Sequence, residues 1–434
     1  MTIAIKVLHL AAHMGGGVGK ALSGLISQTI ASGAPIKHSI VLFEKPEKTQ
    51  FVSHIRNSGC EVFICPTTAQ LIDLIDDADL VQLEWWNHPA TIAGLCALPP
   101  LPMKLVVWCH SSGLFFPGIP EELIRAAHRF LPSSACSFEG GSIGRLAPQL
   151  GDRLAVVSSC GGFAGLPEPE TAISENENIS VGYFGSFNFA KLHPHFIDYL
   201  AAVTIPDFKV RMIGDLLNQD ILIGQCIKAG KPDLLEFRGY STEVEKELAS
   251  INVLAYLLNP THYGTAENAL LEAMAIGIVP IVLNNPAERQ IVEHGRTGLV
   301  VNSIDEFADA IALLSNDPQL RHRLGLEAAR FVRKKFSLES GMRSLNAQYF
   351  SVASMGKSEV SFSKIFGADP AEWFLSCQQM PSIFMEDGTL NFHIDEFGRY
   401  GLFEKSKGTV FHFHSYFPDN VRLRLWADNL ELLR

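Results

Sequence analysis

Apolar runs of strand length alternate with helical patterns along this 434-residue chain, and the alternation occurs twice. Such alternation predicts parallel sheets that helices cover on both faces. In the first half, the predicted strands are Lys6–Leu10, Ile40–Phe43, Val62–Cys65, Leu80–Glu84, Lys104–Cys109 and Leu154–Val157. In the second half they are Ser180–Phe184, Lys209–Ile213, Leu235–Arg238, Val253–Leu257 and Ile278–Leu283. The expected fold class is therefore α/β, with two Rossmann-like, doubly wound parallel-sheet domains.

A polar segment separates the two halves. Residues 161–178 read GGFAGLPEPETAISENEN, which contains proline and glycine but no hydrophobic period, and we interpret it as a hinge. The expected domains are residues 1–165 and 179–340, followed by a C-terminal appendage at 341–434. The appendage is too aromatic for a disordered tail. His412 and His414 alternate there with phenylalanines, which predicts a strand face. A metal site that combines them with His393 is the less favoured alternative.

Composition excludes several classes of protein. The chain is 47% hydrophobic and 19% charged, as in soluble globular proteins, and its net charge of −11 argues against a nucleic-acid partner. The N-terminus reads as a strand rather than a signal peptide, and no run of about 18 apolar residues predicts a membrane span. The eight cysteines form no CxxC pair and read as buried thiols in a reducing compartment. We expect a cytoplasmic protein, for which peripheral membrane contact stays open.

The segment Asn259–Thr297 carries the strongest functional signal. A polar loop leads into a run of helix formers that starts at Asn268 and ends before a glycine. The first N–H groups of such a helix are unpaired and its dipole is positive there, so the turn with Asn268 and Ala269 suits a diphosphate. Glu272, one turn further, is expected to accept hydrogen bonds from ribose hydroxyls. The alternative is an ordinary loop-helix-strand unit with Glu272 in solvent.

Within this segment, LLEAMAIGIVPIV followed by EHGRTGLVV resembles the signature of the retaining glycosyltransferases of the GT-B fold, family four, the glycosyl transferases group 1. Lys6–Leu10 followed by GGGVGK is similar to the family's first strand and GGVG turn, and the stretch from Gly185 to Lys191 keeps the spacing of its donor loop. The resemblance implies a GT-B enzyme of polysaccharide biosynthesis with a C-terminal extension. Such an enzyme moves a hexose from a nucleotide diphosphate sugar to a glycan, lipid-linked or protein acceptor with retention of configuration.

The resemblance assigns the nucleotide sugar to two loops besides the helix start. Gly16, Gly17 and Gly19 let the backbone approach a ligand closely at a strand-to-helix turn, although a tight turn alone is the alternative. Lys191 is expected to hold the donor diphosphate and to offset the charge that develops on the leaving nucleotide. Because Lys191 and the helix dipole supply positive charge, we expect no cofactor and no metal.

Two positions depart from the family pattern. Ser186 stands where many members have an arginine, so one phosphate contact is missing or comes from Arg211 or Arg238. Gly264 stands where the first of two paired glutamates is usual, and Glu267 is the nearest carboxylate. Glu267 is expected to cover part of the catalytic role through a shifted loop. Without a carboxylate at the usual place, we expect a front-face mechanism in which the leaving phosphate accepts the acceptor's proton.

The acceptor is expected near the end of the first sheet. His110 closes the run LVVWCH, at the edge where open α/β folds hold ligands. The family carries a similar histidine that faces the sugar, so His110 is expected to contact a sugar hydroxyl or to polarise the acceptor through either ring nitrogen. Trp86 is expected to line the acceptor surface, with packing as the alternative.

Two other functions stay open. The departures at Ser186 and Gly264 also fit a catalytically degenerate GT-B protein that binds a nucleotide sugar or a protein partner. A GT-B sugar epimerase is the second alternative, because it would use the same donor without an acceptor.

Overall fold

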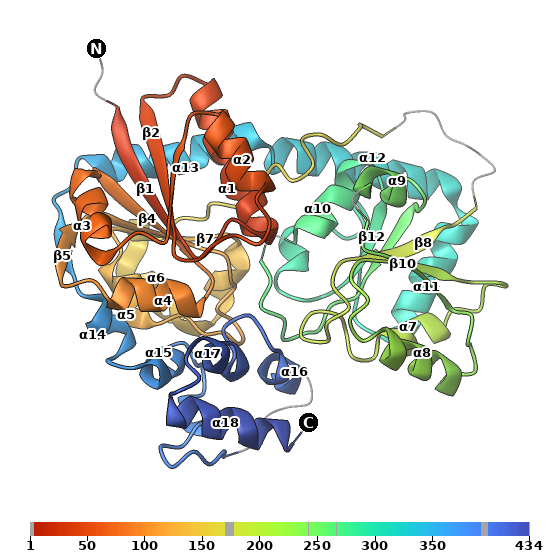
Figure 1. Cartoon of the computed structure of the whole chain (residues 1–434). Helices are drawn as coiled ribbons and strands as arrows, with labels where there is room; N and C mark the ends of the chain where they lie inside the picture. Colours follow the sequence, from red (N-terminus) through yellow and green to blue (C-terminus); the bar gives the residue numbers. More distant parts are fainter. Residues whose placement is uncertain (1–3, 170–177, 242, 266, 392–397, 434) are drawn as a thin grey trace. The chain divides into compact units, whose positions relative to one another are not determined.

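The computed structural model describes residues 4–169, 178–241, 243–265, 267–391 and 398–433 (Figure 1). The chain forms two compact units. Unit 1 contains Met1–Gly161, Tyr263–Thr265 and Leu338–Arg434, and unit 2 contains Gly162–His262 and Ala266–Ser337. The segment expected as a C-terminal appendage, packed against the N-terminal domain, lies in unit 1. Part of the expected hinge, residues 170–177, lies outside the described residues.

Unit 1 is built on a parallel sheet in the order β3-β2-β1-β4-β6-β7. Its strands are β1 (Ile5–Ala11), β2 (Ile36–Leu42), β3 (Glu61–Ile64), β4 (Leu80–Trp85), β6 (Leu105–Cys109) and β7 (Arg129–Pro132). The strand predicted at Leu154–Val157 is wrong. Ala155 and Val157 donate single hydrogen bonds to Phe130 and Pro132, so this segment lies beside β7 without forming a regular ladder.

Apart from the edge strand β3, which has no buried residue, the strands of the unit 1 sheet are mostly buried on both faces, as expected for a parallel sheet. In β1, Val7 and Ala11 belong to one core and Leu8 and Leu10 to the other, because successive side chains point to opposite faces. The first core includes helices α1 (Gly16–Ala31), α2 (Gln50–Asn57) and α13 (Leu338–Ala353). The second includes α3 (Thr68–Asp77), α4 (Pro89–Cys96), α5 (Glu121–Ala126) and α6 (Gly141–Leu150).

The C-terminal segment completes the second core. It contributes α14 (Phe362–Phe366), α15 (Pro370–Ser376), α16 (Gly398–Phe403), α17 (Val410–Tyr416) and α18 (Val421–Glu431), and β14 (Ser358–Val360) pairs antiparallel with β5 (Leu101–Met103). Phe374, Phe413 and Trp426 are each 0% exposed within the same core as the sheet residues. Trp426 also donates a hydrogen bond to the carbonyl of Met385 at 2.8 Å. The segment is thus integral to unit 1.

The strand face predicted for His412 and His414 is wrong, because both lie in helix α17. The Thr409 side chain caps the helix by accepting a hydrogen bond from the His412 N–H at 3.2 Å. Val410 and Phe413 are buried, three residues apart, which is a helical spacing. The alternation with phenylalanines fits the period of a strand, but the burial of this segment follows the period of a helix. His393 lies outside the described residues.

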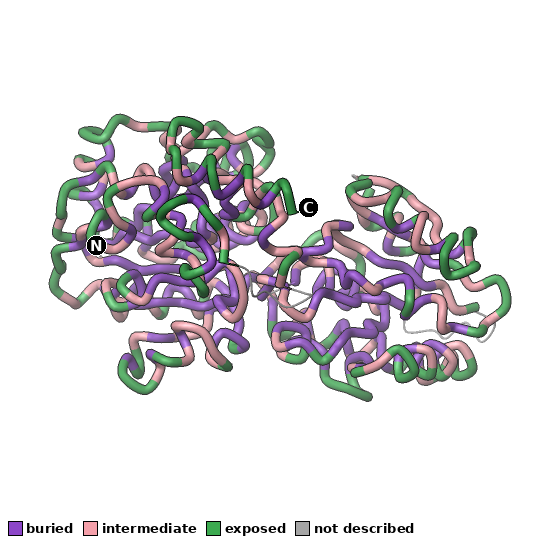
Figure 2. Tube along the Cα trace, turned by 90° about the horizontal axis from the view of Figure 1, so that it is seen from below, coloured by how far each residue is buried: buried purple, intermediate pink, exposed green. Residues whose placement is uncertain are grey.

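Unit 2 repeats the topology of unit 1, with the parallel order β10-β9-β8-β11-β12-β13. Its strands are β8 (Val181–Phe184), β9 (Val210–Ile213), β10 (Leu235–Gly239), β11 (Val253–Tyr256), β12 (Val279–Leu283) and β13 (Leu299–Val301), the last of which was not predicted. Its helices are α7 (Phe196–Ala201), α8 (Gln219–Lys228), α9 (Val244–Leu248), α10 (Asn268–Ala275), α11 (Ile304–Asn316) and α12 (Pro318–Lys335). In both units the central strands are buried, the edge strands β3 and β10 contain no buried residue, and exposed residues concentrate on helices and loops (Figure 2).

All eight cysteines are free thiols, and six of them are buried. The prediction of buried thiols is wrong for Cys65, which is exposed. None of the helices in the described ranges combines the length and the apolar character that crossing a membrane requires.

Candidate active site

In unit 2, two loops meet just beyond the carboxyl ends of β8 and β11. The loop after β8 carries Lys191, and the loop after β11 carries Glu267. The backbone joins them, because Asn259 N–H donates to the Lys191 carbonyl at 2.7 Å and Leu192 forms a β-bridge with Leu258. Ligands of open α/β sheets bind at this edge.

Lys191 and Glu267, both predicted from the sequence, form an ion pair. The distance from Lys191 Nζ to Glu267 Oε2 is 2.9 Å, and the Tyr256 hydroxyl donates to the same oxygen at 2.5 Å. The Glu267 side chain is only 1% exposed, whereas that of Lys191 is 24% exposed. Burial raises the pKa of Glu267, but the charges of Lys191 and His262 outweigh it, so the pKa lies below its ordinary value. Glu267 is therefore ionised at neutral pH and holds Lys191.

A buried histidine connects this ion pair to a second carboxylate. His262 Nε2 lies 3.0 Å from Glu288 Oε1, and its Nδ1 lies 3.8 Å from Glu267 Oε1. Burial lowers the pKa of His262, but the charge and hydrogen bond of Glu288 outweigh it and raise the pKa above its ordinary value. Lys191 and His262 thus contact the two carboxylates of this buried cluster, and buried charges require such partners.

Helix α10 begins directly after Glu267, which has left-handed backbone angles (φ 33°, ψ 69°). Asn268 and Ala269 therefore occupy the first turn, where backbone N–H groups have no partner within the helix. Glu272 lies one turn further and is only 6% exposed, so the alternative of a solvated Glu272 is wrong.

Hydrogen bonds hold the loop after β8, which the resemblance assigns to the donor. The Ser186 carbonyl accepts a hydrogen bond from the Tyr183 hydroxyl at 2.8 Å, and the Ser186 hydroxyl faces the Asn188 N–H at 3.4 Å. Neither arginine suggested as a substitute phosphate ligand is available. Arg211 donates to Ser180 and Ser250 near the start of β8, and Arg238 pairs with Glu236 and Glu247.

In unit 1, the glycine-rich motif forms the start of helix α1. Gly16 has φ +58°, which favours glycine. A Cβ atom on Gly19 would lie 2.5 Å from the Met14 carbonyl oxygen, so close packing requires glycine there. Gly17 occupies the first turn, and no side chain caps the helix. Local structure thus explains Gly16 and Gly19 without a ligand, while the uncapped helix start stays compatible with one.

His110 follows β6 and sits on a buried carboxylate. Its Nε2 lies 2.9 Å from Glu84 Oε2, and Glu84 Oε1 accepts from Gln82 Nε2 at 2.7 Å and faces His9 Nδ1 at 3.0 Å. Burial raises the pKa of Glu84, but the hydrogen bonds from His110 and His9 bring it down to about 2. Behind this group, His9 Nε2 lies 2.9 Å from His38 Nδ1. The His110 ring therefore has a fixed anionic partner.

Trp86 lies beside His110, with ring centroids 6.1 Å apart, and also contacts His13 at 5.6 Å. The neighbouring Trp85 is 0% exposed and stacks on Phe366 in the core. The tryptophan pair thus divides, because consecutive side chains of a strand point to opposite faces.

Sequence reasoning missed the buried partners Glu84, His9, Gln82, Tyr256 and Glu288. A signal existed for three of them. Gln82 and Glu84 alternate within β4, and His9 interrupts the apolar run of β1, although both strands belong to a sheet predicted to be buried on both faces. Polar residues in such strands need a polar partner.

Among the residues that the structure describes, two groups of side chains have metal-like spacing, with ligand atoms within 4.8 Å of one another: His13, Glu44 and His88, and His262, Glu267 and Glu288. In the first group, Nδ1 of His13 and of His88 accepts a backbone N–H, which leaves the proton on Nε2 and disfavours a cation there. In the second, Lys191 already supplies the positive charge. The expectation of a site without a metal stays a prediction.

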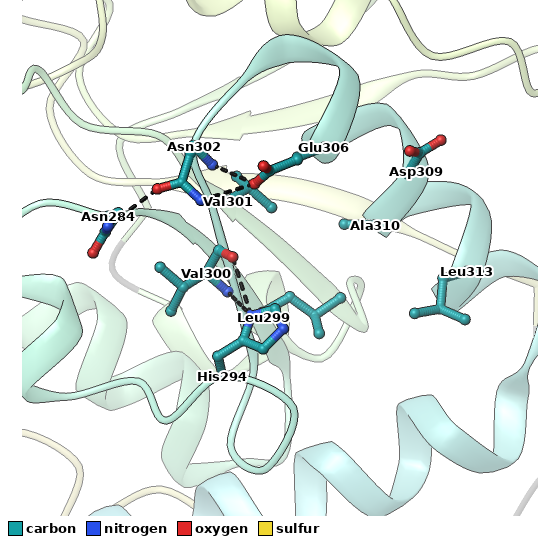
Figure 3. Close-up of a pocket in the computed structure, with 10 residues that line it drawn as sticks. All are labelled: Asn284, His294, Leu299, Val300, Val301, Asn302, Glu306, Asp309, Ala310 and Leu313. Carbon is teal, nitrogen blue, oxygen red and sulfur yellow. Dashed lines mark hydrogen bonds between the residues drawn. The ribbon is translucent and has the colours of Figure 1, made fainter.

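A pocket of about 740 Å³ lies elsewhere, between β13 and α11 (Figure 3). Asn284, His294, Asn302 and Glu306 line it, and Asn302 donates two hydrogen bonds to Glu306. None of the predicted site residues lines this pocket, so its size does not identify the active site.

The region that matches a known family lies mostly in unit 2. Residues 168–331 match the family described as "Glycosyl transferases group 1". The chain is 29% identical over 107 residues to "Alpha-1,3/1,6-mannosyltransferase ALG2" of Dictyostelium discoideum, which covers 24% of this chain and 25% of the relative. It is 26% identical over 186 residues to "N-acetyl-alpha-D-glucosaminyl L-malate synthase" of Bacillus anthracis, which covers 42% and 48%. The matched region thus spans about half, or less, of these relatives.

The fold matches solved structures over most of the chain. The Anabaena protein Alr3699/HepE in complex with UDP superimposes with a TM-score of 0.63 at 18% identity and covers 80% of this chain and 100% of its own. TarM gives a TM-score of 0.63 at 10% identity, with 82% and 99% covered. At such identities the likeness shows the fold, and the predicted GT-B class is confirmed. Residues 168–331 thus resemble the glycosyl transferases group 1 family, in a match that covers less than half of the chain.

Proposed function

We propose that this protein is a retaining glycosyltransferase that moves a hexose from a nucleotide diphosphate sugar to a glycan, lipid-linked or protein acceptor. The observation that carries the proposal is the Lys191–Glu267 ion pair beside the start of α10, within the matched region. The solved relative with UDP supports a uridine nucleotide as the first donor to test.

In this proposal, the donor lies on unit 2. The diphosphate binds Lys191 and the N–H groups of Asn268 and Ala269, with Ser186 nearby in the donor loop, and Glu272 accepts the ribose hydroxyls. Lys191 stabilises the leaving nucleotide because negative charge on the diphosphate grows in the transition state. Glu267 fixes the position of Lys191, so its contribution is indirect and the front-face mechanism needs no protein nucleophile.

The acceptor binds the region of unit 1 that contains Gly17, Trp86 and His110. The aromatic face of Trp86 suits a sugar ring, and His110 contacts a hydroxyl. Neither a cofactor nor a metal takes part in the proposed chemistry.

The test is calorimetric titration with UDP, GDP, ADP and their common sugar conjugates. We expect saturable binding of one nucleotide and a loss of roughly 10- to 100-fold in affinity for Lys191→Ala and Glu272→Ala, the size of one or two charge-assisted hydrogen bonds. Lys228→Ala is the matched control, because Lys228 is an exposed lysine at the end of α8. Thermal melts of each variant check that folding is intact.

The outcomes separate the alternatives. Binding followed by transfer to an added acceptor, with an unchanged anomeric configuration by NMR, supports the proposal. Interconversion of the nucleotide sugar without any acceptor favours an epimerase. Absence of nucleotide binding favours the catalytically degenerate protein suggested by Ser186 and Gly264.

We also propose peripheral membrane contact, which would bring the protein to a lipid-linked acceptor. Leu216, Leu217, Ile221 and Ile227, in and before α8, are 50–61% exposed and offer an apolar surface. Sedimentation with phosphatidylglycerol vesicles tests it, and wild-type protein that stays in the supernatant contradicts it.

A further inference from the structure

A buried polar network lies beneath His110, and the proposed donor chemistry does not use it. Its members lie on one face of the unit 1 sheet, His9 in β1, His38 in β2, and Gln82 and Glu84 in β4. Tyr349 in α13 completes it, because its hydroxyl donates to Gln82 Oε1 at 2.7 Å. All five side chains belong to residues that are at most 4% exposed.

The hydrogen bonds assign a direction to the network. Glu84 is a carboxylate and only accepts, so His9 Nδ1 and His110 Nε2 must both carry a proton. A neutral His9 then presents a lone pair at Nε2, to which His38 Nδ1 donates over 2.9 Å. His38 Nε2 is left as a buried acceptor without a hydrogen-bond partner among the described residues, which costs less than a stranded donor.

We propose that Glu84 is a positioning residue that holds His110 with its proton on Nε2, so that Nδ1 presents a lone pair to a hydroxyl group of the acceptor. The proposed function leaves open which ring nitrogen of His110 contacts the acceptor. This inference rests on the proposed function for one point, that the hydroxyl belongs to an acceptor. Because a carboxylate cannot donate, the other tautomer would lose the hydrogen bond at 2.9 Å.

In the front-face mechanism the proton of the attacking hydroxyl goes to the leaving phosphate, so the hydroxyl that Nδ1 orients is a neighbouring hydroxyl of the acceptor. Holding that hydroxyl restricts the orientation of the acceptor without any proton transfer to His110.

Glu84→Gln tests the assignment sharply. Glu84 Oε1 accepts from Gln82 and His9, so a glutamine should keep its oxygen toward these two donors and turn its NH₂ group toward His110. The NH₂ group requires a lone pair on His110 Nε2, which forces the proton to Nδ1 and removes the acceptor there.

The first measurement uses the full chain labelled with ¹⁵N-histidine, and long-range ¹H–¹⁵N spectra distinguish the two neutral tautomers. His110→Gln identifies the His110 signals by their loss. We expect the Nε2–H form in the wild type, the Nδ1–H form in Glu84→Gln and return of the Nε2–H form in Glu84→Asp. Glu288→Gln is the matched control, because Glu288 is also buried beside a histidine but should leave the His110 signals unchanged.

The second measurement is steady-state transfer. We expect Glu84→Gln to lower kcat/KM for the acceptor by roughly 10-fold, the size of one lost hydrogen bond, and to change the donor KM by less than about 3-fold. Glu84→Asp should recover part of this loss. A merely structural role would not produce this split.

A wild-type His110 that carries its proton on Nδ1 overturns the inference, and so does a Glu84→Gln variant that keeps the Nε2–H form. The wild-type spectrum alone decides this if Glu84→Gln does not fold. The spectra need no substrate, so a protein with the expected tautomer but no transferase activity contradicts the proposed function and not the assignment of His110.

Discussion

At the scale of single residues, the proposed donor site depends on how a buried carboxylate is neutralised. Glu267 is nearly inaccessible and is held by Lys191 and Tyr256. Burying an unpaired carboxylate costs several kcal/mol, so this environment suits a group that positions Lys191 better than one that attacks a sugar. The catalytic role predicted for Glu267 is untested and becomes a narrower proposal.

Removing the charge of Glu267 tests how much its ion pair contributes to the stability of the protein. Glu267→Gln leaves Lys191 beside an uncharged amide and should lower the free energy of unfolding by roughly 3–5 kcal/mol. Glu243→Gln is the control, because Glu243 pairs with Lys246 at the surface, where both side chains are at least 70% exposed. We expect the control to change stability by less than about 1 kcal/mol in urea unfolding. Equal effects of the two substitutions would contradict the description of a buried pair.

The lowered pKa of Glu84 predicts how the stability of the protein depends on pH. Its pKa falls from 4.5 in the unfolded chain to about 2 in the folded protein, so its contribution to stability is complete above pH 4.5 and is lost as the pH falls toward 2. The difference in melting temperature between the wild type and Glu84→Gln should therefore be constant above about pH 5.5 and shrink below pH 4.5. Scanning fluorimetry from pH 3 to 8 measures it. A difference that grows on acidification would show that the sign is wrong.

At the scale of elements, the space around a glycine in a helix shows whether packing alone requires glycine at that position. Gly19 in α1 has no room for a side chain because of the Met14 backbone, whereas nothing lies within 4 Å of a Cβ atom at Gly224 in α8. The GGVG turn was interpreted as a ligand loop, and the structure adds a packing reason for its last glycine. The resemblance and the packing thus both select glycine at position 19.

Alanine at these two positions should have opposite effects. Gly19→Ala should destabilise unit 1 by roughly 1–3 kcal/mol, since backbone atoms must move. Gly224→Ala should stabilise the protein by roughly 0.5–1 kcal/mol, because alanine is the better helix former. Urea midpoints followed by circular dichroism test both. A neutral Gly19→Ala variant with impaired activity would instead favour a purely functional glycine.

At the scale of the whole molecule, the two units have separate sheets and cores, and all five tryptophans lie in unit 1, at positions 85, 86, 108, 373 and 426. Tryptophan fluorescence therefore reports on unit 1 alone, while circular dichroism reports on both units. Proteins with more than one domain often unfold in more than one transition.

A nucleotide that binds unit 2 should act selectively. At about 100 times its dissociation constant it should stabilise the unit 2 transition by roughly 2.7 kcal/mol. The thermal transition seen by circular dichroism should then split or rise, while the midpoint seen by tryptophan fluorescence changes little. Lys191→Ala should abolish the shift at the same nucleotide concentration. Coincident transitions for both probes, with and without nucleotide, would contradict independent units.

The sequence by itself determined the two parallel sheets, most strand positions and the resemblance to a known family. Strands such as Lys6–Leu10 and Val253–Leu257 were predicted within about two residues, because an apolar run between helical patterns has few other solutions. Short strands were harder to predict from the sequence. β7 and β13 have four and three residues, and their hydrogen-bonded neighbours decide that they are strands.

Only the tertiary structure decided which polar groups meet. Period-two alternation places Glu84 on one face of β4, but the order of the strands and the packing of α13 bring His9, His110 and, through Gln82, Tyr349 to it. Likewise, Glu267 finds Lys191 across 76 residues of chain (267 − 191) because two loops converge at one sheet edge. The same holds for α17, whose helical state follows from burying Phe413 in the core of unit 1. Local patterns fix the direction in which a side chain points, whereas its partner and its ionisation depend on residues that only the folded chain brings near.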